Sequence, residues 1–204
     1  MGGIALIDYG AGNLQSVKNA LKAAGAADVV VTADPDVVAK ADRIVLPGVG
    51  AFAHCMSALS AIDGMVAAMD RRVRGEGVPF LGICVGMQLL ADAGVEHGTT
   101  QGLGWIGGTV RAIEPAPEIK VPHMGWNDVA LGGAHPVLAA GEAYFLHSYH
   151  FETSDAVDVL AATHHGSALT AAVGRDNILG VQFHPEKSQA YGIATLQRFL
   201  EWMP

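Results

Sequence analysis

Cys84 is the residue of this chain whose type and surroundings most clearly predict chemistry. It stands between two glycines in the run Gly82-Ile83-Cys84-Val85-Gly86. This spacing is typical of a nucleophile elbow, in which a strained strand-to-helix turn exposes one reactive side chain. The start of a helix also favours a thiolate, because its backbone N–H groups are unpaired. The alternative interpretation is a small buried residue on a tight turn.

The start of a helix is too weak on its own to activate an ordinary thiol. Lowering a thiol pKa from about 8.5 to about 7 requires roughly 2 kcal/mol. A helix terminus supplies only about 0.3 to 1 kcal/mol. A nucleophilic role for Cys84 therefore requires a basic partner elsewhere in the sequence.

The best basic partner is His184, which precedes Pro185 and Glu186 at the end of an apolar run. A following proline holds a residue in an extended conformation, and residues two apart in an extended chain face the same way. Glu186 can therefore orient the imidazole and fix its tautomer. Taken alone, this segment also fits a surface turn. Together with Cys84 it supplies a nucleophile, a base and an orienting carboxylate, which predicts acyl transfer through a thioester.

The other histidines and cysteines predict neither a metal site nor a cofactor. His147 and His150 are three residues apart, and such residues on a strand point to opposite faces. The adjacent His164 and His165 are expected in a polar turn. The two cysteines are too few for a disulfide framework or a thiolate zinc site, so Cys55 is expected to pack in the core.

Two glycine-containing turns follow predicted strands earlier in the chain. Gly10 and Gly12 resemble part of a dinucleotide loop, but Gln15 stands where the fingerprint needs a third glycine, so we disfavour a nucleotide site. Residues 47–52 fit a phosphate loop, a plain turn or an oxyanion hole built from backbone N–H groups. Because the next predicted strand carries Cys84, we favour the oxyanion hole.

The order of elements predicts an α/β fold, with one domain over residues 1–204. Strands alternate with helices up to about residue 94, and mainly strands follow, so we expect three layers: a central mostly parallel sheet, helices on both faces and an antiparallel extension. Ligands bind beyond the carboxyl ends of such strands, where both glycine turns and Cys84 lie.

Strands are predicted at residues 4–7, 29–31, 44–46, just before 84, and at 105–113, 127–131, 143–149, 159–162, 168–173 and 178–183. Helices are predicted from 14 to a stop at 25, at 53–74, from 85 to about 94, and at the C-terminal end, with an apolar stripe of Ile193, Leu196, Phe199, Leu200 and Met203.

Composition narrows the class of protein. The chain has 204 residues, half of them hydrophobic, and a formal net charge of −8. An acidic chain of this kind argues against a nucleic-acid partner and fits a soluble enzyme. Gln88 and the charges around it argue against a transmembrane segment near Cys84, so no membrane partner is expected. No basic segment precedes a long apolar run at the N-terminus, so a cytoplasmic location is expected.

Residues 82–88 together with Phe183-His184-Pro185-Glu186 resemble the class I glutamine amidotransferases, in both order and separation. Residues 8–13, 47–50, 122–127 and 184–188 look like a branch of that family, the glutaminase subunits of imidazole glycerol phosphate synthase. The resemblance covers nearly the whole chain and implies the family's three-layer fold. It implies that glutamine is hydrolysed to glutamate, and that ammonia passes to a cyclase subunit in a heterodimer. The cyclase would use it to convert a ribulosyl intermediate into imidazole glycerol phosphate and an aminoimidazole carboxamide ribotide in histidine biosynthesis.

The resemblance also implies roles for individual residues. Val85 stands where leucine is frequent in the family, which is harmless if only its N–H acts, and Ser148 where threonine is also common. The implied residues are Cys84, His184 and Glu186 for catalysis; Gly50 and Val85 for the oxyanion hole; Gln88, Glu96, His147, Ser148 and Tyr149 for glutamine; and Asn13, Trp126 and Lys187 toward the cyclase.

Two other hypotheses compete with this one. The first is another class I subunit, such as the pyridoxal phosphate glutaminase, or a different cysteine hydrolase. The second is a catalytically inactive binding module that keeps the fold, although the presence of Cys84, His184 and Glu186 argues against it.

Overall fold

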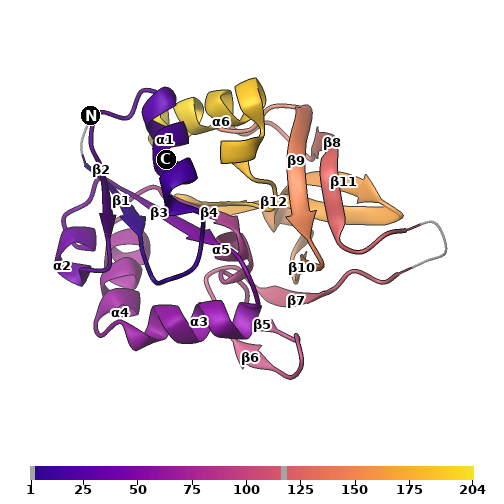
Figure 1. The fold of residues 1–204 in the computed structure, drawn as a ribbon, viewed down its shortest axis with the longest axis horizontal. Coiled ribbons are helices and arrows are strands. Elements are labelled where there is room, and N and C mark those ends of the chain that lie inside the picture. Colours follow the sequence, from indigo (N-terminus) through magenta and orange to yellow (C-terminus); the bar gives the residue numbers. More distant parts are fainter. Residues whose placement is uncertain (1–2, 116–118) are drawn as a thin grey trace.

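A computed structural model describes residues 3–115 and 119–204, and a nine-stranded sheet forms its centre (Figure 1). The first five strands in spatial order pair in parallel, and the remaining pairs are antiparallel. This arrangement confirms the predicted parallel centre with an antiparallel extension. In spatial order the strands are β2 (Val29–Thr32), β1 (Ile4–Ile7), β3 (Arg43–Gly48), β4 (Phe80–Cys84), β13 (Ile178–Val181), β12 (Ser167–Arg175), β11 (Val159–His165), β8 (His123–Leu131) and β9 (Gly141–His147).

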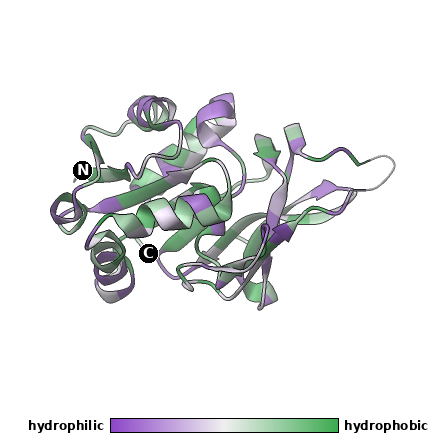
Figure 2. Ribbon diagram, turned by 60° about the horizontal axis from the view of Figure 1, so that its bottom comes forward, coloured by the Kyte–Doolittle hydropathy of each residue, from purple (hydrophilic) through white to green (hydrophobic). Residues whose placement is uncertain are grey.

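Helices cover both faces of the sheet, as predicted. Helices α1 (Leu14–Ala23) and α6 (Gln189–Glu201) pack together on one face, while α2 (Pro35–Val38), α3 (Phe52–Ala61) and α4 (Met65–Asp70) lie on the other (Figure 1). Hydrophobic residues dominate the central strands, and hydrophilic residues gather on the surrounding helices and loops (Figure 2). Strands β1, β3 and β4 are almost continuously buried. Parallel strands covered on both faces require such continuous apolar runs.

A second, smaller sheet lies beside the main one. Its spatial order is β10 (Tyr149–Thr153), β7 (Gly108–Ala112), β5 (Ala93–Gly94) and β6 (Thr100–Gln101). The strand predicted over 143–149 ends too late. Strand β9 ends at His147, and after Ser148 the chain continues as β10 in the other sheet. The predicted strand over 105–113 begins only at Gly108.

The single helix predicted over residues 53–74 is wrong. Helices α3 and α4 are separate and meet at a bend of 93°. Ile62 is extended after α3, and Gly64 precedes α4 with a φ of 75°, a left-handed conformation that glycine adopts readily. After α4 the chain adds a π-helical turn, Arg71–Gly75. Within residues 3–115 and 119–204, no single helix is long and apolar enough to cross a membrane, and only this bent pair meets that test jointly.

The helix after Cys84 is also shorter than predicted. Helix α5 spans only Val85–Gln88, and β5 occupies the region of the predicted end near Gly94. The carbonyl groups of Leu89, Leu90 and Ala91 accept hydrogen bonds from the N–H groups of residues 103–106 instead of continuing the helix. Tertiary hydrogen bonds therefore end α5.

Three smaller expectations also need correction. His164 and His165 lie in β11 and not in a turn. Strand β8 begins at His123, four residues before the predicted start, and β13 ends at Val181. In the C-terminal stripe, Leu196, Phe199 and Leu200 are buried, whereas Met203 follows the end of α6 and is 88% exposed.

Candidate active site

Cys84 occupies a strained turn between β4 and α5. Its φ of 54° and ψ of −110° are rare for a residue with a Cβ, and such strain is concentrated at functional sites. The two flanking glycines permit close packing. A Cβ on Gly86 would lie 1.9 Å from the carbonyl oxygen of Leu46, and one on Gly82 would lie 2.5 Å from that of Gly86. The elbow is therefore strained at the cysteine itself, and its glycines let the turn fit against β3.

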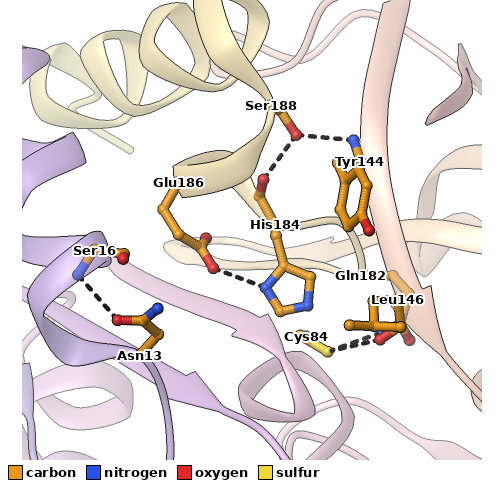
Figure 3. A network of polar contacts seen from close by, with 9 residues as sticks. All are labelled: Asn13, Ser16, Cys84, Tyr144, Leu146, Gln182, His184, Glu186 and Ser188. Carbon is orange, nitrogen blue, oxygen red and sulfur yellow. Dashed lines mark hydrogen bonds and ion pairs between the residues drawn. The ribbon is translucent and has the colours of Figure 1, made fainter. Parts of the chain in front are cut away.

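Strand pairing brings the predicted base to the thiol. Strands β4 and β13 are parallel neighbours, with Ile83 opposite Val181, and His184 follows three residues later. His184 is extended, as predicted, and its Nδ1–H donates to Oε1 of Glu186 at 2.8 Å (Figure 3). Both side chains are buried. The histidine, carboxylate and thiol therefore converge at the ends of two adjacent strands.

The main chain of His184 is fixed by Ser188. The Ser188 hydroxyl donates to the His184 carbonyl at 2.7 Å and accepts from the N–H of Tyr144 at 2.9 Å (Figure 3). The N–H of His184 donates to the Tyr144 carbonyl at 2.9 Å. These three hydrogen bonds join the segment around the turn Pro185–Lys187 to β9.

The environment of His184 favours the protonated imidazole. Burial alone lowers the pKa of His184, but hydrogen bonds to Cys84 and Glu186, with their negative charges, outweigh burial and raise it to about 10. The positive charge is favourable because an anionic partner lies on each side. The arrangement therefore favours the imidazolium form of His184 at neutral pH.

A cavity of about 310 Å³ opens over Cys84. Its lining includes all residues predicted to bind glutamine or to form the oxyanion hole, as well as Cys84 and His184. Glu186 lies behind His184, and Asn13 and Trp126 lie outside the lining. The lining consists of Val49, Gly50, Cys84, Val85, Gln88, Glu96, Pro122, Leu146, His147, Ser148, Tyr149, His184 and Lys187.

The loop after β3 reaches the cavity because β3 pairs with β4, with Gly48 opposite Cys84. Gly50 and Val85 both line the cavity, and among the described residues no heavy atom beyond the chain neighbours of Gly50 lies within 4 Å of a Cβ built on it. Free space of this kind beside backbone N–H groups suits an oxyanion hole.

Two of the predicted glutamine-binding side chains already make hydrogen bonds within the protein. Nε2 of Gln88 donates to the Tyr149 carbonyl and to Oε1 of Gln182, each at 2.9 Å. Oε2 of Glu96 accepts from the N–H of Phe52 at 2.8 Å. Burial, the charge of Glu96 and a hydrogen bond to Glu96 raise the pKa of Tyr149, so Glu96 also contacts this neighbour. Gln88 and Glu96 both line the cavity, where both can contact a ligand.

His147 belongs to a chain of neutral imidazoles. Burial, followed by the charge of neighbouring histidines, lowers its pKa to about 3, and burial lowers the pKa of His123 to about 4. Nδ1 of His147 lies 2.8 Å from the Tyr149 carbonyl, and its Nε2 lies 2.9 Å from Nδ1 of His123. Both ring nitrogens of His147 are therefore used within the protein.

The three residues predicted to face the partner lie near the cavity mouth or outside it. Asn13 caps α1 by accepting from the N–H of Ser16 at 3.2 Å. Trp126 is 46% exposed on β8, and Lys187 lies over the ring of Tyr144 at 5.8 Å.

Sequence reasoning missed two residues that contact the thiol. The thiol of Cys84 donates to the Leu146 carbonyl at 3.9 Å, and Nε2 of Gln182 donates to Sγ of Cys84 at 3.6 Å (Figure 3). Gln182 lies two residues before His184. The alternation that placed Glu186 on the side of His184 therefore also indicated Gln182.

Comparison with known proteins gives the family. The model of the family described as glutamine amidotransferase class-I matches residues 5–201. The chain belongs to the class-I glutamine amidotransferase family. It is therefore an enzyme of the glutamine amidotransferase type.

Curated relatives of this glutamine amidotransferase match it over nearly their whole length. The chain is 64% identical over 205 residues to imidazole glycerol phosphate synthase subunit HisH of Zymomonas mobilis, covering 98% of this chain and 96% of that protein. It is 54% identical to the HisH subunit of Caulobacter vibrioides, with coverage of 98% and 99%.

Solved structures agree in fold. A crystal structure of a glutamine amidotransferase has a TM-score of 0.75 at 21% identity and covers 98% of each chain. The structure of PurLQS from Thermotoga maritima has a TM-score of 0.71 at 19% identity, covering 98% of this chain and 99% of that one. These similarities support the three-layer α/β fold.

Proposed function

We propose that this chain is the glutaminase subunit of imidazole glycerol phosphate synthase. It hydrolyses glutamine and passes ammonia to a cyclase subunit for histidine biosynthesis. The observation that carries the chemistry is the convergence of Cys84, His184 and Glu186 at one cavity. The choice of synthase rests on the 64% identity to a HisH subunit.

In the first half of the reaction, the Cys84 thiolate attacks the carboxamide carbon of glutamine. The sulfur–carbon bond forms as the carbonyl electron pair moves onto oxygen, where the N–H groups of Gly50 and Val85 stabilise it. The oxyanion collapses, the carbon–nitrogen bond breaks, and the imidazolium of His184 protonates the leaving nitrogen. Ammonia leaves and a thioester remains on Cys84.

In the second half, water hydrolyses the thioester. Neutral His184 takes a proton from the water as its oxygen attacks the thioester carbon. The carbon–sulfur bond then breaks, which releases glutamate and restores the thiolate beside the imidazolium. Glu186 keeps Nδ1 of His184 protonated, so that Nε2 faces the reacting atoms throughout.

The remaining cavity residues fit the amino-acid end of glutamine. Oε1 of Gln88 and the carboxylate of Glu96, which both line the cavity, are acceptors for the α-ammonium group. Ser148 and Tyr149 lie where the chain passes from β9 to β10 and supply polar groups for the carboxylate. His147 supports this segment through its contact with the Tyr149 carbonyl.

The partner is a cyclase subunit that binds as a heterodimer over the side of the cavity bearing Lys187 and Trp126, with Asn13 on the same contact surface. The exposure of Trp126 supports this assignment. We further propose that residues 1–204 act as one domain in the cytoplasm. The continuous nine-stranded sheet and the family match over 5–201 support one domain.

The decisive experiment replaces Cys84 with alanine in the presence of a cyclase subunit. Cys84→Ala abolishes glutamine-dependent cyclisation and leaves ammonia-dependent cyclisation intact, because only the glutaminase step needs the thiol. Loss of both activities in a folded variant would contradict the proposal. Activity with and without the cyclase measures how far the partner activates this chain.

Labelling separates the proposal from an inactive binding module. A glutamine-analogue chloroketone alkylates Cys84 in the complex, and the label stays on Cys84 in Cys55→Ala, because Cys55 is fully buried away from the cavity lining. No label in the complex would favour the binding module. Copurification with a pyridoxal phosphate synthase in place of the cyclase would favour the other class I subunit.

A further inference from the structure

Gln182 is a buried polar side chain that the mechanism above does not use. It is 0% exposed and stands between β13 and His184. Its side-chain amide contacts the nucleophile at one end and a wall of the glutamine cavity at the other. A fully buried amide that reaches the reactive sulfur requires an explanation beyond packing.

Hydrogen bonds fix which end of this amide faces the thiol. The Tyr149 carbonyl can only accept, so Nε2 of Gln88 must face it, at 2.9 Å. The same Nε2 lies 2.9 Å from the Gln182 side chain, which must therefore present its oxygen. The nitrogen of Gln182 is then directed toward Sγ of Cys84 at 3.6 Å (Figure 3). A backbone carbonyl thus determines, through two amides, that the thiol receives a donor.

We infer that Gln182 positions and stabilises the Cys84 thiolate by donating an N–H hydrogen bond to it, and couples it to Gln88 in the glutamine cavity. This inference rests on the proposed function and deepens it. A donor favours the thiolate over the thiol, because only the anion accepts strongly. The thiol has a different partner, the Leu146 carbonyl, to which it donates at 3.9 Å.

The coupling gives Gln182 a second effect. Gln88 is held through its Nε2 by Gln182 and Tyr149, and it lines the cavity in which glutamine is proposed to bind. A glutamine that binds Gln88 therefore acts on the same amide pair that holds the sulfur. When the thioester forms, sulfur loses its negative charge and the bond from Gln182 weakens, so Gln182 supports the attacking state more than the acylated one.

The test uses chloroacetamide, which alkylates thiolates and needs neither glutamine nor a cyclase. In Gln182→Met, a substitution of similar size, alkylation of Cys84 at neutral pH is roughly tenfold slower, and its pH profile moves to higher pH. Gln182→Glu keeps the acceptor toward Gln88 but places an anion beside the sulfur, so its profile moves further. Gln197→Met, on the exposed outer side of α6, is the matched control and retains the wild-type profile.

If the pH dependence of Cys84 alkylation in both Gln182 variants coincides with that of wild type, the inference is overturned. A side chain that only fills space would leave the ionisation of Cys84 unchanged. If neither variant folds, the unaltered chain decides: in its NMR spectrum the Gln182 side-chain amide shifts over the pH range in which alkylation rises, and Cys84→Ala abolishes that shift. An amide signal that does not move would refute the hydrogen bond. Because no arm uses glutamine, failure here is distinguishable from failure of the glutaminase proposal, which the cyclisation assay tests.

Discussion

The backbone of Cys84, the proposed nucleophile, is strained. Its φ of 54° is a backbone conformation that costs a residue with a Cβ on the order of 1 to 3 kcal/mol. The strain persists because strands β3 and β4 pair up to this position, with Gly48 opposite Cys84. A residue without a Cβ would be released from it.

Replacing Cys84 with glycine should therefore stabilise the fold relative to alanine. Both variants lack the thiol, so the difference isolates the backbone. We expect the free energy of unfolding of Cys84→Gly to exceed that of Cys84→Ala by about 1 to 2 kcal/mol. Urea denaturation measures it. Equal stabilities would show that the turn carries no strain at this position.

The pKa of His184 predicts how stability depends on alkaline pH. The pKa in the fold is about 10, against about 6.5 in the unfolded chain. Because the folded state holds the proton more tightly, the stabilisation is fully present below about pH 6.5 and is lost as pH rises through about 10. We expect wild type to lose more stability than His184→Asn between these values in thermal unfolding. Parallel curves would contradict the raised pKa.

At the level of elements, the close approach of α5 to β3 is the packing feature on which the elbow depends. A Cβ at Gly86 would lie 1.9 Å from the Leu46 carbonyl oxygen, so one of the two elements must move. For Gly75, in the π-helical turn after α4, a Cβ would meet no heavy atom within 4 Å from the described residues outside its own turn. The two glycines therefore form a matched pair.

Gly86→Ala should destabilise the protein by about 3 kcal/mol or more and abolish glutaminase activity, because overpacking displaces the elbow. Gly75→Ala should change stability by less than about 1 kcal/mol and retain activity. Chemical denaturation and the cyclisation assay measure both effects. Similar losses in the two variants would show that backbone rigidity, and not contact with β3, dominates.

The elements also show what sequence patterns can and cannot predict. The pairing of His184 with Glu186 was predictable because it depends only on local extended geometry. The break between α3 and α4 was not, because the apolar pattern continues through Ile62 and Met65 and only the φ of Gly64 interrupts the helix. The early end of α5 depends on hydrogen bonds from residues 103–106, which no local pattern reveals.

Gln182, which donates a hydrogen bond to Cys84, was only partly predictable from the sequence. Gln182 follows from the same alternation as Glu186. Its role depends on Gln88, which is 94 positions away in the sequence and meets it only through the fold.

For the molecule as a whole, the predicted partner surface is an aromatic and cationic patch beside the cavity. Trp126 packs edge-on against Tyr144 with ring centroids 6.2 Å apart, and the ammonium group of Lys187 lies 5.8 Å from the centroid of the same Tyr144 ring. Met124, two residues before Trp126 on β8, is 65% exposed. Exposed tryptophan and methionine are enriched where proteins bind one another.

Trp126→Ala should weaken binding of the cyclase subunit by about 30-fold, the effect of losing an interface residue worth roughly 2 kcal/mol. Calorimetry measures the dissociation constant. Val157→Ala, which removes a 73% exposed apolar side chain elsewhere, is the control and should bind as wild type does. Equal affinities for both variants would remove Trp126 from the interface.

The pairing of β4 with β13 has a consequence for the order in which the protein is made. The ribosome completes β4 and its thiol long before β13, since Gln182 follows Cys84 by 98 positions. A nascent chain without β13 has neither the imidazole nor the amide that act on the sulfur. Cys84 meets its proposed base and donor only when β13 is inserted beside β4. On the proposed mechanism, hydrolytic activity therefore arises in the same step that closes the centre of the sheet, and chains that have not inserted β13 should release no ammonia.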